Sequence, residues 1–286
     1  MQTFQLRRIL CPVDFSSHSE LALRVAGQVA SAFGAEVVAL HAQRFEAPLY
    51  FTAAQTAALK AQLRRGMRDA RSYLQDFAEK QLPSGIRRSF EIVEEDPADA
   101  VLDFSRKSAA DMVVMATHGR SGLAKIRLGS VTETVLRQIN IPILTLGPQL
   151  KPFPAGSRVH RILCPVDYSH LARVAFEHAV ILSQTLGAEL IVVHVLDAGH
   201  AVDQAKQSLC DWVPEGVRQQ CSIKEVVRHG KPAEQVLQEV KESGADLLVI
   251  GAAPRNVLGA MLFGSTTERL IRSAPCPVLS VIGKQA

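Results

Sequence analysis

The feature that most constrains the fold of this chain is a unit that occurs twice. The segment RILCPVDFS at residues 8–16 returns as RILCPVDYS at residues 161–169. The correspondence continues into a second apolar run, GAEVVALH in the first copy and GAELIVVH in the second. It resumes after a middle stretch that is longer in the first copy, where the dipeptide starting at Gly129 matches the one starting at Gly264. The period is far longer than the roughly 20–50 residues of stacked repeats, so it indicates a duplicated domain.

The duplication predicts two domains and a connection between them. The stretch 148–157 holds three prolines and a glycine, a composition typical of a linker. We therefore predict a first domain at 1–147, a linker at 148–157 and a second domain at 158–286. Both segments are of ordinary domain length.

Each copy alternates short buried-strand patterns with amphipathic helical patterns. This alternation predicts an α/β fold, in which each domain is a five-stranded parallel sheet with helices on both faces. A serine precedes the first helix and Gly34 follows it, whereas Pro97 opens a later helix at its first turn. The partly alternating third strand favours a position near a sheet edge. In the first copy we expect strands at 7–13, 35–42, 86–94, 111–116 and 141–146, and helices at 16–33, 55–80, from 97, and at 130–138.

The composition excludes several functions. The net charge of +4 is small, so we expect no nucleic-acid partner. No apolar run approaches the ~18 residues of a membrane-spanning helix, and nothing resembles a targeting signal, so we expect a cytoplasmic protein without a membrane partner. The five cysteines show no spacing typical of a metal site, and we expect them to be reduced thiols.

Two loops of the first copy carry the residues that suggest a ligand site. One follows the first strand and contains Asp14, and the other runs from Ala116 to Ser130. Ligands of open parallel sheets bind at the carboxyl ends of strands where the strand order reverses, so both loops would line one crevice if the first and fourth strands are neighbours.

The second loop has the chemistry of a phosphate cradle. Gly119 and Gly129 allow close approach of the backbone, and a helix that starts at Ser130 would offer free N–H groups to an anion. Thr132 adds a hydroxyl, and three basic residues, Arg120, Lys125 and Arg127, lie between. Asp14 would accept from ribose hydroxyls or hold a cation. The loop is not a Walker A motif, because the GK[ST] ending is absent.

Simpler interpretations stay open for each of these residues. The pair at Gly129 is also typical of a plain helix N-cap, and Asp14 of a cap within its loop. His41 and His194, at strand ends, are more typical of hydrogen-bonded core histidines than of ligands. No arrangement of Ser, Cys, His and Asp indicates nucleophilic catalysis.

These motifs resemble the universal stress protein family in its tandem form, over nearly the whole chain. The family's nucleotide motif is Gly, two residues, Gly, nine residues, Gly and then Ser or Thr. The first copy places Ala116, Gly119 and Gly129-Ser130 at these positions, and the second places Gly251, Pro254 and Gly264-Ser265 there. The resemblance implies two tandem Rossmann-like domains of the adenine nucleotide alpha hydrolase-like type. It also implies ATP, with or without Mg²⁺, as the ligand.

The resemblance assigns residues to each site by position. The first site would comprise Pro12, Val13, Asp14, Ala42, Met115, Ala116, His118, Gly119, Arg120, Gly129, Ser130, Val131 and Thr132. A second, weaker site would comprise Pro165, Val166, Asp167, Val195, Gly251, Gly264, Ser265, Thr266 and Thr267. The resemblance further implies that the fifth strands, at 141–146 and 276–281, pair the two domains as a pseudo-dimer, with a homodimer of chains also possible.

Two departures from the motif predict unequal sites. Ala116 replaces a glycine in the first copy, which is tolerable in a β-like conformation. Pro254 replaces a glycine in the second copy and has no N–H to donate. The residues that follow it also carry one basic side chain, where the first copy has three. Losing one hydrogen bond to a charged acceptor predicts ATP affinity about ten- to hundredfold lower in the second copy.

The leading functional hypothesis is a stress-response protein that senses ATP mainly through its first domain. We expect no enzyme beyond a weak ATPase, because neither loop offers a clear base for water. One alternative is a partner-binding module in which both nucleotide sites are degenerate. Another is an adenylate-forming enzyme or ATP pyrophosphatase on a related fold, although no SGGxDS-type loop is present.

Overall fold

The computed structural model describes residues 5–44, 52, 54–55, 69–117, 128–148, 150, 158–196, 202–252 and 264–283. The described residues form two compact units. The smaller unit comprises those between 6 and 115, and the larger unit comprises Ala116, Thr117 and those from 128 onward, with Gln5. The predicted boundaries of the sequence domains stay a prediction.

The smaller unit contains the first four strands of the first copy. Its sheet has the order β3-β2-β1-β4, and all printed pairings are parallel. β3 stands at the end of this order, as its partial alternation predicts. The elements are β1 (Arg8–Pro12), α1 (Ser17–Phe33), β2 (Glu36–Ala42), β3 (Arg87–Val93), α3 (Pro97–Lys107) and β4 (Met112–Ala116), whose last residue belongs to the larger unit.

Local sequence sets the helix ends of this unit. The hydroxyl of Ser16 accepts from the N–H of Ser19 at the start of α1, and Gly34 ends the helix with a left-handed φ of 66°. Asp96 caps α3 immediately before Pro97. Of the predicted helix at 55–80, residues 69–79 are helical, whereas 56–68 lie outside the described residues.

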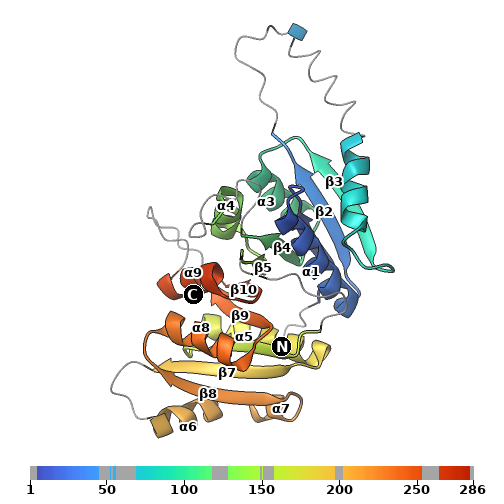
Figure 1. Ribbon diagram of the computed structural model, residues 1–286. Helices are drawn as coiled ribbons and strands as arrows, with labels where there is room; N and C mark the ends of the chain where they lie inside the picture. Colours follow the sequence, from blue (N-terminus) through green and yellow to red (C-terminus); the bar gives the residue numbers. More distant parts are fainter. Residues whose placement is uncertain are drawn as a thin grey trace. The chain divides into compact units, whose positions relative to one another are not determined.

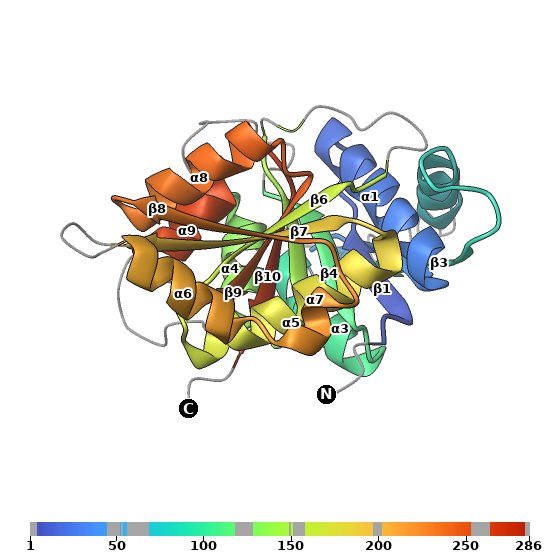
Figure 2. The same ribbon diagram turned by 90° about the horizontal axis from the view of Figure 1, so that it is seen from below.

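The larger unit contains the complete second copy together with two elements of the first. Its elements are α4 (Ser130–Gln138), β5 (Ile143–Leu146), β6 (Arg161–Pro165), α5 (His170–Leu186), β7 (Glu189–Leu196), α6 (Val202–Trp212), α7 (Glu215–Arg218), β8 (Ile223–His229), α8 (Pro232–Ser243), β9 (Leu247–Ala252), α9 (Ser265–Ser273) and β10 (Val278–Ile282). The five strands of the second copy form a parallel sheet in the order β10-β9-β6-β7-β8, of which Figure 1 labels β10, β9, β7 and β8. Helices α8 and α9 cover one face, and α5 and α6 cover the other (Figure 2).

The strand order creates the crevice that the sequence argument requires. β6 is the first strand of its copy and lies between β7 and β9. The strand order therefore reverses at β6, because later strands are added on both of its sides. β1 likewise pairs with β2 and β4. The first and fourth strands are therefore neighbours in each copy, and the loops that follow them emerge at the same edge.

The fifth strands pair as the resemblance implies. β5 runs antiparallel to β10, with Leu144 opposite Leu279 and Thr145 opposite Val278. The hydroxyl of Thr145 also donates to the carbonyl of Val278 over 3.2 Å. Both leucines are buried, so this pairing is part of the core of the larger unit.

Candidate functional site

A cavity opens at the carboxyl ends of the strands in the second copy. Its volume is about 400 Å³, within the usual range for small-molecule sites. Residues of the β6 loop, the end of β7, the start of α8, β9 and the first turns of α5 and α9 line it. They are Pro165, Val166, Asp167, Ser169, Leu171, Ala172, Val193, Val195, Pro232, Val236, Ile250, Gly251, Gly264, Thr266, Thr267 and Leu270.

The loop after β6 holds Asp167 at this cavity. The Asp167 carboxylate is exposed, and its Oδ1 accepts from the N–H of Ser169 over 3.0 Å. Ser169 in turn caps α5 by accepting from the N–H of Ala172. Between them Tyr168 adopts a left-handed φ of 62°, which is costly for an aromatic residue and must be held by its surroundings.

His194 supplies part of that support. Its Nδ1 lies 2.8 Å from the carbonyl oxygen of Val166, and its ring centroid lies 4.4 Å from that of Tyr168. The first copy repeats this arrangement: Nδ1 of His41 lies 2.7 Å from the carbonyl of Val13, and Phe15 has a φ of 62°. Both histidines therefore secure the loop after the first strand, which agrees with their interpretation as hydrogen-bonded core residues.

Gly264 begins the phosphate-cradle helix of the second copy. It is the N-cap of α9, and no side chain of the described residues makes a capping hydrogen bond to this helix. Its φ of −59° is accessible to any residue, and a Cβ built on it meets nothing within 4 Å. Neither backbone conformation nor packing within the described residues requires glycine here. The free space and the uncapped N–H groups suit the close approach of an anion.

Gly251, by contrast, has a packing role. A Cβ at this position would stand 2.5 Å from the carbonyl oxygen of Leu171 and 2.7 Å from its carbon. The backbone of α5 thus passes directly over β9 at this residue. The first glycine of the second motif is explained by this close helix–strand contact.

The structure gathers eight of the nine residues predicted for the second site around one cavity. They are Pro165, Val166, Asp167, Val195, Gly251, Gly264, Thr266 and Thr267, whereas Ser265 is exposed and is not among the lining residues. Sequence reasoning missed the apolar wall, which comes from Leu171, Val193, Pro232, Val236, Ile250 and Leu270 together with Ser169 and Ala172. The alternation that points Val193 and Val195 to the same face of β7 is the signal that would have found part of it.

The residues predicted for the first site fall on both units. Pro12, Val13, Asp14, Ala42 and Met115 belong to the smaller unit, and Ala116, Gly129, Ser130, Val131 and Thr132 belong to the larger. His118, Gly119 and Arg120 lie outside the described residues, as do Lys125, Arg127 and the Pro254 segment. The two groups are therefore described separately.

Each group has a defined local structure. Oδ1 of Asp14 accepts from the hydroxyl and the N–H of Ser16, over 2.5 and 3.0 Å. Gly129 is the N-cap of α4 and, like Gly264, begins a helix for which the described part of the chain supplies no side-chain cap. Thr132 is buried, and its hydroxyl donates to the carbonyl of Ala116 over 2.9 Å. This contact gives the predicted phosphate ligand Thr132 a structural role in the described chain.

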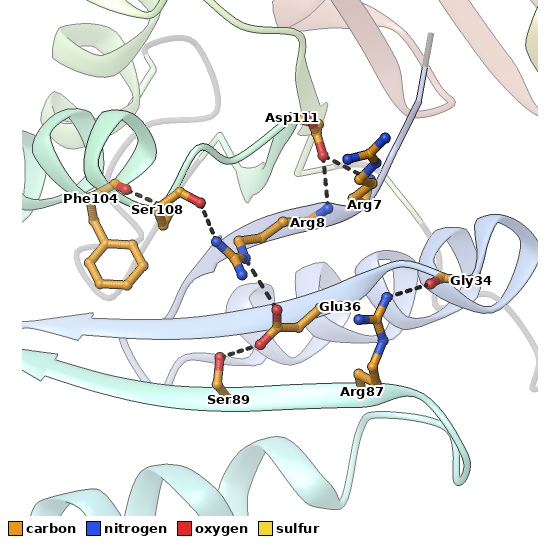
Figure 3. Close-up of polar contacts among 9 residues, drawn as sticks. All are labelled: Arg7, Arg8, Gly34, Glu36, Arg87, Ser89, Phe104, Ser108 and Asp111. Carbon is orange, nitrogen blue, oxygen red and sulfur yellow. Dashed lines mark hydrogen bonds and ion pairs between the residues drawn. The ribbon is translucent and has the colours of Figure 1, made fainter. Parts of the chain in front are cut away.

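A polar network at the opposite edge of the β3-β2-β1-β4 sheet is structural (Figure 3). Oδ2 of Asp111 accepts from the N–H groups of Arg7 and Arg8, over 2.8 and 2.9 Å. Glu36 receives the Arg8 guanidinium at 3.1 Å and the Ser89 hydroxyl at 2.9 Å. In the second copy the Asp246 carboxylate accepts from the N–H groups of His160 and Arg161, at the start of β6. This network joins the amino-terminal ends of the strands. The candidate ligand sites lie at the carboxyl ends.

The described parts of the chain contain neither a cluster of metal ligands nor a membrane-spanning helix. No group of three or more His, Cys, Asp or Glu side chains is arranged to hold a metal ion there. None of the helices in those parts is long and apolar enough to cross a membrane.

The fold and the cavity define a class: a duplicated, doubly wound α/β protein with a cavity of small-molecule size at the carboxyl ends of parallel strands. Comparison with known families identifies it further. The model of the universal stress protein family matches residues 5–146 and again residues 158–281. The chain belongs to the universal stress protein family, in its tandem form.

Individual relatives agree with this assignment. A universal stress protein of Mycolicibacterium smegmatis is 26% identical over 293 residues, which cover 96% of each chain. One of Methanocaldococcus jannaschii is 30% identical over 141 residues, covering 49% of this chain and 81% of the relative. The crystal structure of a universal stress protein from Archaeoglobus fulgidus shares the fold, with a TM-score of 0.73 at 21% identity, and covers 97% of this chain and 99% of its own.

Proposed function

We propose that this chain binds adenine nucleotides at the carboxyl edges of its sheets, with ATP held mainly by the first copy, and acts as a cytoplasmic stress-response sensor. The observation that carries the proposal is the open space at Gly264, at the mouth of an uncapped helix and on the wall of a 400 Å³ cavity. The nucleotide motif implies that the base is adenine and that the ligand is ATP, with or without Mg²⁺.

The assignment of tighter ATP binding to the first copy rests on sequence and on α4. Gly129 begins an uncapped helix with a φ of −62°, so it repeats the arrangement at Gly264. The sequence before it carries three basic residues that the second copy reduces to one. Positive charge near a helix N-terminus favours a triphosphate.

The test is calorimetric titration of the full chain with ATP, combined with three glycine-to-alanine variants. We expect one tight class of ATP sites that Gly129→Ala weakens at least tenfold, because the methyl group enters the anion space. Gly216→Ala is the matched control: Gly216 is exposed on α7, a Cβ there also meets nothing, and it does not line the cavity. Gly264→Ala reports on the second copy.

Thermal unfolding supplies an independent readout. ATP at a hundred times its Kd should stabilise the chain by about 2.7 kcal/mol. If adenine nucleotides give neither heat of binding nor a thermal shift, the proposal is wrong and the partner-binding alternative takes its place. Two ATP sites of equal affinity would contradict the assignment of ATP mainly to the first copy.

A further inference from the structure

We infer that the cavity of the second copy selects an adenine nucleoside carrying at most one phosphate and discriminates against ATP. The inference rests on the proposed function for the adenine moiety. Beyond the proposed function, the inference names the class of ligand and explains its selectivity by the charge on the cavity wall.

The described part of the cavity wall carries a single charged side chain. Among its sixteen described lining residues only Asp167 is charged, and its carboxylate is negative. The wall therefore offers no described side chain that would neutralise a triphosphate. In sequence, residues 253–263 contribute only Arg255, where the corresponding stretch of the first copy has Arg120, Lys125 and Arg127.

The basic residues on neighbouring elements have other contacts. Arg269 of α9 pairs with Glu234 over 3.0 Å, and Arg272 pairs with Glu268. Arg173 of α5 lies over the Trp212 ring, 3.7 Å from its centroid, and donates to the Trp212 carbonyl. Lys231 precedes the lining residue Pro232 but is exposed and does not itself line the cavity. None of these cations faces the cavity as a lining group.

What the wall does offer matches a nucleoside. Val193 and Val195 of β7 together with Pro232 and Val236 of α8 form an apolar surface suited to a base. Asp167 presents an exposed carboxylate that can accept from vicinal sugar hydroxyls. The N-terminus of α9, with Thr266 beside it, can bind one phosphate through N–H groups and a hydroxyl.

Further phosphates would meet an unfavourable field. A helix N-terminus carries about half a positive charge, which suits a single phosphate. Each additional phosphate adds negative charge at a cavity that Asp167 also lines, and no cation among the described lining residues compensates for it. This repulsion is electrostatic, so salt must weaken it.

The experiment isolates the second cavity in the full chain by using Gly129→Ala to weaken the first site. The variant is titrated with adenosine, AMP and ATP in buffer containing EDTA. We expect AMP to bind at least tenfold more tightly than ATP, with adenosine also tighter than ATP. Raising the salt concentration should narrow the AMP–ATP difference. Adding Gly264→Ala should remove AMP binding, which places the ligand at this cavity.

Asp167→Asn supplies the sharper test, because it should change the affinities for two ligands in opposite directions. Loss of the carboxylate should weaken adenosine several-fold and strengthen ATP several-fold. Asp203→Asn is the charge-matched control, since Asp203 is exposed on α6 and does not line the cavity. It should change neither affinity.

The possible failures are distinguishable. If wild-type chain binds no adenine ligand at all, the proposed function is wrong and this inference falls with it. If wild type binds ATP but the Gly129→Ala variant binds ATP at least as tightly as AMP, or binds neither, only this inference is overturned. Equal weakening of all three ligands by Asp167→Asn would also overturn it, because the carboxylate would then not discriminate by charge.

Discussion

At the scale of residues, two glycines of the second motif differ in what they do. Gly251 is required by packing, because a Cβ would overlap the backbone carbonyl of Leu171 at 2.5 Å. Gly283 is also near Leu171, but there the clash is with the end of a side chain that can rotate away. Gly264 has neither constraint. Glycines of one sequence motif can thus be present for different physical reasons.

This difference predicts stability effects of different size. Gly251→Ala should lower the free energy of unfolding by about 1–3 kcal/mol, because overpacking against backbone cannot be relieved by a rotamer change. Gly264→Ala should lower it by no more than about 1 kcal/mol, the usual difference between glycine and alanine at a helix N-cap. Urea denaturation of the unliganded chain measures both. A loss at Gly264→Ala as large as that at Gly251→Ala would show that this glycine has a packing role.

At this scale the family resemblance named residues that the structure brings together around one cavity, and the limits are physical. Gly264 and Asp167 were assigned through the family motif, and both line the cavity. The motif did not identify Leu171 or Val236, which reach the cavity from α5 and α8 only after the helices pack on the sheet. It also did not foresee the left-handed Tyr168, since nothing in an aromatic residue signals a positive φ.

At the scale of elements, the antiparallel β5–β10 pairing joins the two copies' fifth strands. β10 is buried throughout its centre, with Leu279 at 1% and Ser280 at 0% exposure. The sequence indicated this pairing only through the family resemblance, because apolar strands do not specify their partners. The long predicted helix of the first copy shows the opposite case: its period predicts it directly, and residues 69–79 follow the prediction.

The pairing predicts the behaviour of the second copy alone. A fragment of residues 158–286 lacks β5 and exposes the edge of β10, with its unpaired backbone groups beside buried side chains. We expect this fragment to self-associate, which light scattering coupled to size exclusion would detect. Ser280→Pro should suppress the association by removing an edge N–H. A monomeric fragment as stable as the full chain would contradict this expectation.

At the scale of the whole molecule, the cysteines link stability to pH. The five cysteines are free thiols, and Cys11, Cys164 and Cys276 are buried. Burial raises the pKa of the Cys164 and Cys276 thiols to about 12, and it raises the pKa of Cys11 as well. In the unfolded chain the same thiols ionise near pH ~8.5.

The sign of the resulting effect follows from proton binding. Above about pH 8.5 the unfolded chain releases protons that the folded chain retains, so the free energy of unfolding must fall as pH rises. At pH ~9.5 each buried thiol should cost about 1.4 kcal/mol relative to pH 7.5. Urea denaturation at both values tests this expectation. Cys164→Ala should reduce the pH dependence by about the contribution of one thiol, whereas Cys210→Ala, at an exposed position, should leave it unchanged. Identical pH dependence in wild type and Cys164→Ala would mean that the core admits the thiolate, and the buried strands of the second copy would then be more permeable to water than their packing indicates.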